Sequence, residues 1–447
     1  MPKRLLIVVT ALLVWAGPAQ AFSKQPGTQT MDDGAVLAYD LYVPDGTAPV
    51  TGWPGVVVMH GLGGSKDSIA DVAGAFAKDG WAVLAYSSRG QGTSTGDLTL
   101  AGPREIADER AMEQFFAGLP QVSDTAIGAW GVSYGGGQVW DGLAAGIPYK
   151  AADVVATWTD LYSALWPQDI ARSGIVAGFA HAVEATSPFI RQVEGEAVDS
   201  SNPAAVKALA AQRSAFAALG RITAPVYLFQ GRVDWAFDVT QAENGYLRVK
   251  GPKHLYVGQF GHPPSTFSSA DFPYAIAQGI AWLDHYVRGQ ANGIDRTPPV
   301  SIAAATGPKR ATYPGIPKTK NVGMGFRGTT GTRLGPKIGE GLETFGVSIL
   351  KVQVRSVAHY PRLVAVLRVG NRVISHGAIK PAKGLDTIRL ANYVQYLPKG
   401  TRLTLSLGPD GGAADFAYLG FPGAAGSIAL GSAYLTLQTL TRPISGP

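Results

Sequence analysis

The segment TAIGAWGVSYGGG, residues 125–137, carries the pattern that decides the fold. Its first half is an apolar run typical of a buried strand, and a G-x-S-x-G pattern centred on Ser133 follows directly. A serine placed so between a strand and a helix predicts a sharp turn that exposes its hydroxyl. Residues two before and two after it must be small, because strand and helix cross behind it. Gly131 and Gly135 meet that requirement, so we predict that Ser133 is a nucleophile.

The chain around this turn alternates apolar runs with amphipathic segments. Residues 56–59 form a continuous apolar run, as expected of a strand buried on both faces, and residues 68–78 carry apolar side chains at helical spacing. We expect further strands at residues 81–86, 225–230 and 253–257, and a helix at residues 103–119. This alternation predicts the α/β class, with a parallel sheet flanked by crossover helices.

A serine hydroxyl needs a base, and the base needs an orienting carboxylate. Asp234 comes just after one predicted strand and His262 just after the next. The order Ser133, Asp234, His262 is that of the α/β-hydrolase architecture. Of the 7 histidines, His262 alone follows the last core strand. We therefore predict these three residues as the catalytic triad, with Asp238 as the alternative acid.

An oxyanion hole for such a nucleophile needs two donors. The backbone N–H of Tyr134, which follows the nucleophile, is one, and the N–H of Leu62, in the loop after Met59, is the other. We expect His60 to hold that loop by hydrogen bonding. No metal site and no cofactor are predicted, because no suitable ligand spacing occurs, and the absence of Cys excludes thiol catalysis and thiolate metal sites.

A mostly helical insertion is expected at about residues 160–220, where it forms a lid over the nucleophile and a pocket for an acyl substrate, either a small molecule or a peptide. Its predicted substrate-binding residues, each of which could equally be ordinary core, are Trp158, Trp166 and Phe179. The carboxylates available there for a substrate ammonium are Asp160, Asp169 and Glu184.

From residue 296 the pattern changes to strands without helices between them. Residues 402–407 and 435–438 alternate between apolar and polar side chains, which indicates half-buried sheets and hence a β-sandwich. The stretch 308–336 is rich in Gly and Pro and is predicted to be a linker or long loop. We therefore divide the chain into a catalytic domain, residues 22–295, and a β-sandwich domain, residues 296–447.

Charge changes sign at the same boundary. Residues 296–447 hold 19 Lys and Arg against 5 Asp and Glu, a net charge of +14, whereas residues 22–295 hold 17 against 27, a net charge of −10. The basic part either docks on the acidic part of its own chain or attaches to anionic envelope material, such as lipopolysaccharide or lipid headgroups. No nucleic-acid motif is visible, so no nucleic-acid partner is expected. The oligomeric state stays open.

The N-terminus has the pattern of an export signal. Lys3 and Arg4 precede an apolar run of 12 residues, 5–16, and a small-x-small site ends at Ala21. This run is shorter than the roughly 20 residues that span a bilayer. We expect cleavage of a signal peptide, residues 1–21, and a secreted or periplasmic protein; a retained anchor is the alternative.

Four segments together resemble the Xaa-Pro dipeptidyl-peptidase and cocaine-esterase-like group. They are GVSYGG at 131–136, SRGQGTS at 88–94, AWLDHYVRG at 281–289 and LPKGTRL at 397–403. The resemblance covers most of the chain after the signal peptide. It implies a hydrolase core, a helical insertion over the site and a jelly-roll-like C-terminal domain.

One segment departs from that group. Its members generally supply an oxyanion donor from a tyrosine side chain after the early strand, whereas this chain has His60-Gly61-Leu62-Gly63-Gly64. A backbone donor is the implied replacement. The departure favours carboxylic ester hydrolysis through an acyl-enzyme over the release of Xaa-Pro dipeptides, which stays the alternative. A function of another class, an envelope-binding protein with an idle hydrolase core, is also open.

Overall fold

The computed structural model describes residues 21–183, 187–328, 331–420 and 426–446. The predicted signal peptide, apart from Ala21, and Glu184 lie outside the described residues. Within these ranges no helix has the length and apolar character that crossing a bilayer requires.

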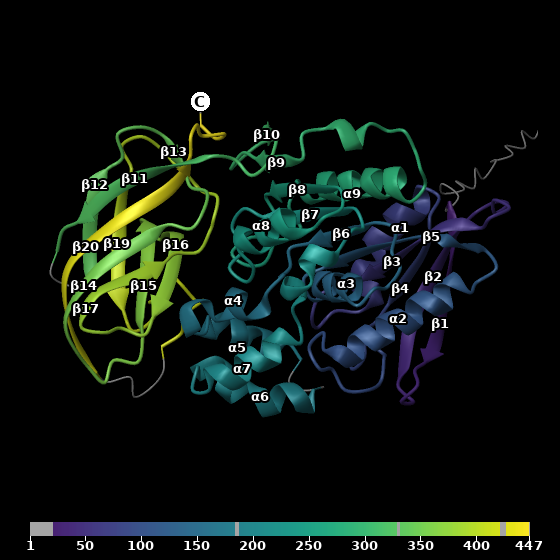
Figure 1. Cartoon of the computed structure of the whole chain (residues 1–447), viewed down its shortest axis with the longest axis horizontal. Coiled ribbons are helices and arrows are strands. Elements are labelled where there is room, and N and C mark those ends of the chain that lie inside the picture. The colour runs from purple at the N-terminus through teal and green to yellow at the C-terminus, as the bar shows by residue number, and fades with distance from the viewer. Residues whose placement is uncertain (1–20, 184–186, 329–330, 421–425, 447) are drawn as a thin grey trace, which may run out of the picture.

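A ten-stranded sheet forms the larger part of the molecule, in the order β1-β2-β4-β3-β5-β6-β7-β8-β9-β10 (Figure 1). Its inner strands from β4 to β9 run parallel, and β1, β2 and β10 add antiparallel edges. The strands are β1 (Phe22–Thr30), β2 (Val36–Pro44), β3 (Trp53–Met59), β4 (Ala82–Tyr86), β5 (Val122–Val132), β6 (Ala152–Val155), β7 (Val226–Gly231), β8 (Lys253–Gly258), β9 (Val300–Ala303) and β10 (Arg310–Tyr313).

Helices cover both faces of this sheet. Helices α1 (Ala70–Lys78) and α9 (Phe272–Tyr286) pack on one face with Val56 and Val58, while α2 (Pro103–Ala117), α3 (Tyr134–Ala144) and α8 (Val239–Arg248) pack on the other with Val57 and Met59. Alternate residues of β3 therefore enter opposite cores, as the continuous apolar run predicts.

The helical insertion lies between β6 and β7. It contains α4 (Leu161–Leu165), α5 (Ser173–His181), α6 (Pro188–Asp199) and α7 (Pro203–Ala211), which Figure 1 shows gathered between the large sheet and the C-terminal strands. The N-terminus of α5 contacts the C-terminal part directly, because the Gly174 N–H donates to the carbonyl of Ala417 at 3.0 Å.

The C-terminal part is a sandwich of two antiparallel sheets. One has the order β11-β20-β14-β17 and the other β12-β19-β15-β16, and their facing apolar side chains, such as Leu350, Leu405 and Leu435, form a separate core. The strands are β11 (Thr319–Phe326), β12 (Thr332–Lys337), β14 (Ile349–Ala358), β15 (Leu363–Val369), β16 (Arg372–Ile379), β17 (Gly384–Arg389), β19 (Arg402–Gly408) and β20 (Ser427–Leu440); β13 (Leu342–Glu343) pairs with β18 (Tyr396–Leu397). The predicted fold class, an α/β core with a helical insertion and a β-sandwich, is confirmed.

Two local expectations differ from the structure. Strands β9 and β10 lie beyond residue 295, where the boundary was placed, yet they extend the first sheet, since Val300 and Ile302 pair with β8 and enter its core. The stretch 308–336, expected to be a linker or loop, contains β10, β11 and β12. One of its glycines, Gly323, leaves room for a neighbour on β20, because a Cβ there would collide with the Tyr434 hydroxyl.

A buried ion pair joins the two parts of the molecule. Arg232, just after β7, donates to a Glu343 oxygen of β13 at 2.6 Å. The acid thus comes from the basic domain and the base from the acidic one. Burial alone would raise the pKa of Glu343, but the Arg232 charge and the Ser445 donors outweigh burial and hold that pKa below its usual value.

Replacing Glu343 by Ala should lower the free energy of unfolding by about 3 kcal/mol, because Arg232 is left buried without its partner. Since the folded-state pKa of Glu343 is lowered, this stabilisation is complete at neutral pH and is lost as the pH falls through that pKa. The control is Glu340→Ala, which removes an exposed ion pair with Lys320 and should leave the unfolding midpoint unchanged. Equal effects of the two substitutions in urea unfolding would contradict the assignment.

Candidate active site

Ser133 occupies a strained turn between β5 and α3. Its φ of 55° and ψ of −119° lie in a region that L-residues rarely adopt. The Ser133 N–H donates to the Val155 carbonyl at 2.8 Å, and its own carbonyl accepts from the Thr157 hydroxyl at 2.7 Å. Bonds to the next strand and its following loop therefore hold the turn in place.

The two flanking glycines are sterically required, as the sequence predicts. A Cβ on Gly135 would lie 2.3 Å from the Met59 carbonyl oxygen, and one on Gly131 would lie 2.3 Å from the Gly135 carbonyl oxygen. Both obstacles are backbone atoms, which cannot rotate away. The absence of these side chains lets α3 start directly against β3 and β5.

The structure brings the three predicted triad side chains together. The Nε2 atom of His262 lies 2.8 Å from the Ser133 hydroxyl oxygen, and its Nδ1 lies 2.8 Å from Oδ2 of Asp234. An ionised carboxylate only accepts, so Nδ1 carries the proton and Nε2 is free to accept from the serine. This continuous chain of hydrogen bonds can move a proton off Ser133.

Asp234 is fully buried and its carboxylate is fixed by backbone donors. Oδ1 accepts from the N–H groups of Ala236 and Phe237 at 3.0 and 2.9 Å, and Oδ2 accepts from the backbone N–H of His262 at 3.0 Å. The alternative acid, Asp238, instead caps α8 through the Thr240 N–H at 2.9 Å. Its position makes it a structural residue, so Asp234 is the acid that faces the imidazole.

The His262 ring is surrounded by aromatic edges. The rings of Phe237, Phe267 and Phe179 lie 5.1, 5.4 and 5.9 Å from it, all near perpendicular. These rings cover most of the imidazole, whose side chain is 11% exposed.

The loop after β3 passes beside the serine. A Cβ on Gly61 would lie 3.5 Å from the Ser133 Cβ, so Leu62 follows next to the nucleophile. Tyr134 is the first residue of α3, whose N–H is among the donors that a helix leaves free. The two predicted oxyanion donors thus belong to the two segments that border the Ser133 hydroxyl.

His60 holds this loop rather than transferring protons. Its Nε2 accepts from the Ser88 N–H at 3.0 Å and its Nδ1 lies 2.7 Å from the Gly61 carbonyl oxygen. Burial lowers the pKa of His60 to about 4, so the ring is neutral and Nδ1 donates. Gln91 adds a second anchor that sequence reasoning missed, since it accepts from the Gly63 N–H at 2.7 Å. The glycine-rich pattern of residues 88–94 was the available signal.

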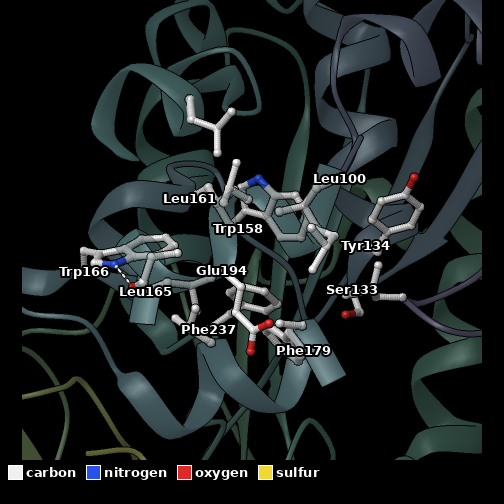
Figure 2. Close-up of a pocket in the computed structure, with 17 residues that line it drawn as sticks. Leu100, Ser133, Tyr134, Trp158, Leu161, Leu165, Trp166, Phe179, Glu194 and Phe237 are labelled. Atoms are coloured by element: carbon white, nitrogen blue, oxygen red, sulfur yellow. Dashed lines mark hydrogen bonds between the residues drawn. The ribbon is translucent and has the colours of Figure 1, made fainter. Parts of the chain in front are cut away.

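Two cavities meet at Ser133. The first, here the insertion cavity, has a volume of about 70 Å³ and is lined mainly by apolar side chains of the insertion (Figure 2). The second, here the His262 cavity, has about 350 Å³ and is lined by His262, Phe267 and Trp130 among others. Ser133, Leu62 and Phe179 line both. Ser133 therefore lies at the junction of the two cavities.

All three predicted substrate-binding residues line the insertion cavity. Trp158 and Trp166 are also tied into the fold, because their indole N–H groups donate to the carbonyls of Arg213 and Ala197 at 2.6 and 2.7 Å. Phe179 lines both cavities. The two tryptophans therefore both line the cavity and belong to the packed core of the insertion.

Of the three carboxylates singled out in the insertion, the structure describes Asp160 and Asp169, and neither lines a cavity at Ser133. Asp160 caps α4, and Asp169 accepts from the Tyr162 hydroxyl at 2.9 Å. Glu194 instead lines the insertion cavity, and sequence reasoning missed it (Figure 2). Its spacing from Ile190 and Ala197, both of which line the same cavity, was the available signal. Among the described residues, no three metal-ligating side chains cluster as a metal site would require.

Known proteins match both the sequence and the fold. The family described as X-Pro dipeptidyl-peptidase (S15 family) matches residues 33–264. A CocE/NonD family hydrolase from Staphylococcus aureus superposes with a TM-score of 0.71 at 14% identity, covering 94% of this chain and 93% of that one. No curated protein matches the sequence significantly.

Two further structures share the fold over nearly their whole lengths. An aminopeptidase from the marine sediment archaeon Thaumarchaeota archaeon and an alpha-amino acid ester hydrolase each have a TM-score of 0.67 and 12% identity. They cover 97% and 99% of this chain, and 98% of each of their own chains is covered. The resemblance noted from the sequence motifs is confirmed.

Gly135→Ala should lower the free energy of unfolding by about 3 kcal/mol, the upper end for overpacking, because the added methyl meets the Met59 backbone. The control is Gly220→Ala, where a Cβ meets nothing within 4 Å. That variant should be as stable as the parent or slightly more so. Comparable melting temperatures for the two variants would show that the elbow tolerates a side chain.

Proposed function

This chain belongs to the X-Pro dipeptidyl-peptidase (S15 family) group and is a serine hydrolase; we propose that it cleaves carboxylic esters through Ser133, His262 and Asp234. The observation that supports this proposal most strongly is the pair of 2.8 Å contacts that link the three side chains. No other arrangement described above offers an activated nucleophile.

The proposed reaction runs through an acyl-enzyme. His262 Nε2 takes the Ser133 proton as the hydroxyl oxygen attacks the ester carbonyl, and the N–H groups of Tyr134 and Leu62 hold the oxyanion. The imidazolium, stabilised by Asp234, then gives its proton to the leaving alcohol. Water, activated by the same imidazole, attacks the acyl-enzyme and releases the acid.

Each cavity would hold one part of the ester. A leaving alkoxide must lie within reach of the histidine that protonates it, and His262 lines only one of the two cavities described above. The alcohol therefore occupies the His262 cavity, and the acyl group occupies the insertion cavity. Because that cavity is small and mostly apolar, the preferred acyl group is compact and uncharged.

The alternative function is release of Xaa-Pro dipeptides, and one observation favours it. The carboxylate of Glu194 lines the otherwise apolar insertion cavity, where it could pair with the ammonium of a substrate N-terminus. Asp160 and Asp169, the carboxylates first considered for this purpose, are already engaged elsewhere in the insertion. Glu194 is thus the residue that distinguishes the two substrates.

A panel of p-nitrophenyl esters beside Gly-Pro and Ala-Pro p-nitroanilides separates these functions. Esters with short apolar acyl groups should have a higher kcat/KM than the anilides. Glu194→Gln should leave the kcat/KM of the esters within about twofold, because an uncharged acyl group forms no ion pair with Glu194. Ser133→Ala should remove turnover of every substrate, because triad members act as a unit.

A faster reaction with the anilides, lost in Glu194→Gln, would assign the dipeptidyl-peptidase function instead. Ester turnover by the Ser133→Ala variant would contradict both functions, since each depends on Ser133.

We further propose that the chain is exported by cleavage after Ala21 and that its sandwich binds an anionic envelope surface. Lys351, Arg355 and Arg389 are exposed, and along β14 the exposed side chains alternate with the buried Leu350 and Val352. Their outward positions leave them available to anionic headgroups.

Cell fractionation tests export and attachment together. The mature chain should begin at Phe22, sediment with envelope material at low salt and leave it as salt screens the charges. A chain that starts with Met followed by Phe22 is the control and should stay in the cytoplasm. An N-terminus at Met1 in the envelope fraction, or retention insensitive to salt, would contradict these two proposals.

A further inference from the structure

The loop that carries the proposed catalytic acid is hydrogen-bonded by a buried arginine of the insertion, Arg172. This acid loop, residues 232–238, turns back on itself so that its own N–H groups bond Asp234. Its outward carbonyls, those of Trp235 and Ala236, accept from Nη1 of Arg172 at 3.0 and 3.2 Å. Nη2 of the same guanidinium lies 3.3 Å from Asp238.

Arg172 is unusual for an arginine because it is only 2% exposed. It precedes the first residue of α5, and its backbone N–H donates to the Leu165 carbonyl of α4 at 2.8 Å. Arg172 is therefore fixed within the insertion. A buried guanidinium is costly unless acceptors surround it, and the acid loop supplies them. The insertion that shapes the substrate cavity is thereby linked to the loop that orients the base.

The β-sandwich holds the acid loop at both ends. At its far end, the N–H of Asn392 donates to Oδ2 of Asp238 and its carbonyl accepts from the Val239 N–H, both at 3.2 Å. At its near end, the Val394 N–H donates to the Arg232 carbonyl at 2.8 Å. One short segment between β17 and β18 thus fixes both flanks of Asp234.

The side chain of Asn392 fastens this segment in turn. Its Nδ2 donates to Glu243 of α8 at 3.0 Å, and its Oδ1 accepts from the Gly346 N–H of the sandwich at 2.6 Å. Beside it, the ring of Trp235 packs at 5.3 Å against His376, whose own partners are Asp415 and Tyr393 at 2.8 and 2.9 Å. Trp235, which directly follows Asp234, therefore packs against the sandwich.

We propose that Arg172 and Asn392 are positioning residues for Asp234, so that the insertion and the β-sandwich both take part in catalysis by holding the acid loop. The proposal rests on the triad function given above. Neither residue touches Ser133 or His262 in any contact described here. They act by keeping Oδ2 of Asp234 at hydrogen-bond distance from Nδ1 of His262, a geometry that tolerates little displacement.

The test compares four variants of the full-length mature enzyme. Arg172→Met removes the guanidinium, Arg172→Lys keeps a charge that cannot reach the two carbonyls and Asp238 at once, and Asn392→Ala removes the fastening side chain. Arg333→Met is the matched control, because Arg333 is a buried arginine that donates to the Gly431 carbonyl within the sandwich, away from the acid loop.

Two quantities are measured on protein shown to be folded by its melting transition. One is kcat with a p-nitrophenyl ester, and the other is the far-downfield proton resonance that a histidine N–H gives when it is hydrogen-bonded to a carboxylate. We expect kcat to fall about 100-fold in Arg172→Met and roughly tenfold in Asn392→Ala, with Arg172→Lys between parent and Arg172→Met. The resonance should shift or disappear in the same order.

Arg333→Met should leave kcat and the resonance at parent values. Parent-like kcat and resonance in folded Arg172→Lys and Asn392→Ala would overturn the proposal, whether or not Arg172→Met folds. A folded parent enzyme that turns over neither the p-nitrophenyl esters nor the Xaa-Pro p-nitroanilides would instead refute the triad function itself, so the two failures are distinguishable.

Discussion

The strained backbone at Ser133 is the constraint on which the site depends. Its positive φ keeps the hydroxyl above the sheet, and the contact of Gly135 with the Met59 carbonyl keeps α3 against β3. Because Met59 ends β3, the same contact places the following loop, with Gly61 and Leu62, beside the nucleophile. One close backbone approach therefore positions both Ser133 and the segments that would stabilise an oxyanion.

Three parts of the molecule hold the hydrogen-bonded chain of Ser133, His262 and Asp234. The large sheet presents Ser133, Asp234 and His262 at the ends of strands β5, β7 and β8. The insertion closes a mostly apolar cavity over the serine, and its Arg172 donates to carbonyls of the acid loop. The sandwich bonds the same loop through the backbone of Asn392. A buried Asp is stable only with several donors, which explains why so many backbone groups converge there.

Local patterns made the elbow and the triad order predictable, because a G-x-S-x-G turn and strand-end carboxylate and histidine residues are read within a few neighbouring positions. What could not be predicted depends on distant contacts. Residues from 296 on were expected to be strands of the sandwich, but a four-residue strand such as β9 does not show which sheet it joins. The role of Arg172 is visible only in the fold, where its Nη1 lies 3.0 Å from the carbonyl oxygen of Trp235, 63 residues away in sequence. Glu194 lay on a predictable helix face, but nothing local shows that this face borders Ser133.

The central claim is that Ser133 is an activated nucleophile at the junction of two cavities. Reaction of the folded mature enzyme with a fluorophosphonate, followed by intact mass and peptide mapping, tests it most directly. The account predicts a single adduct on the peptide containing Ser133, formed far more slowly when His262 is replaced by Ala. No adduct, or an adduct on another residue with Ser133 unmodified, would contradict it.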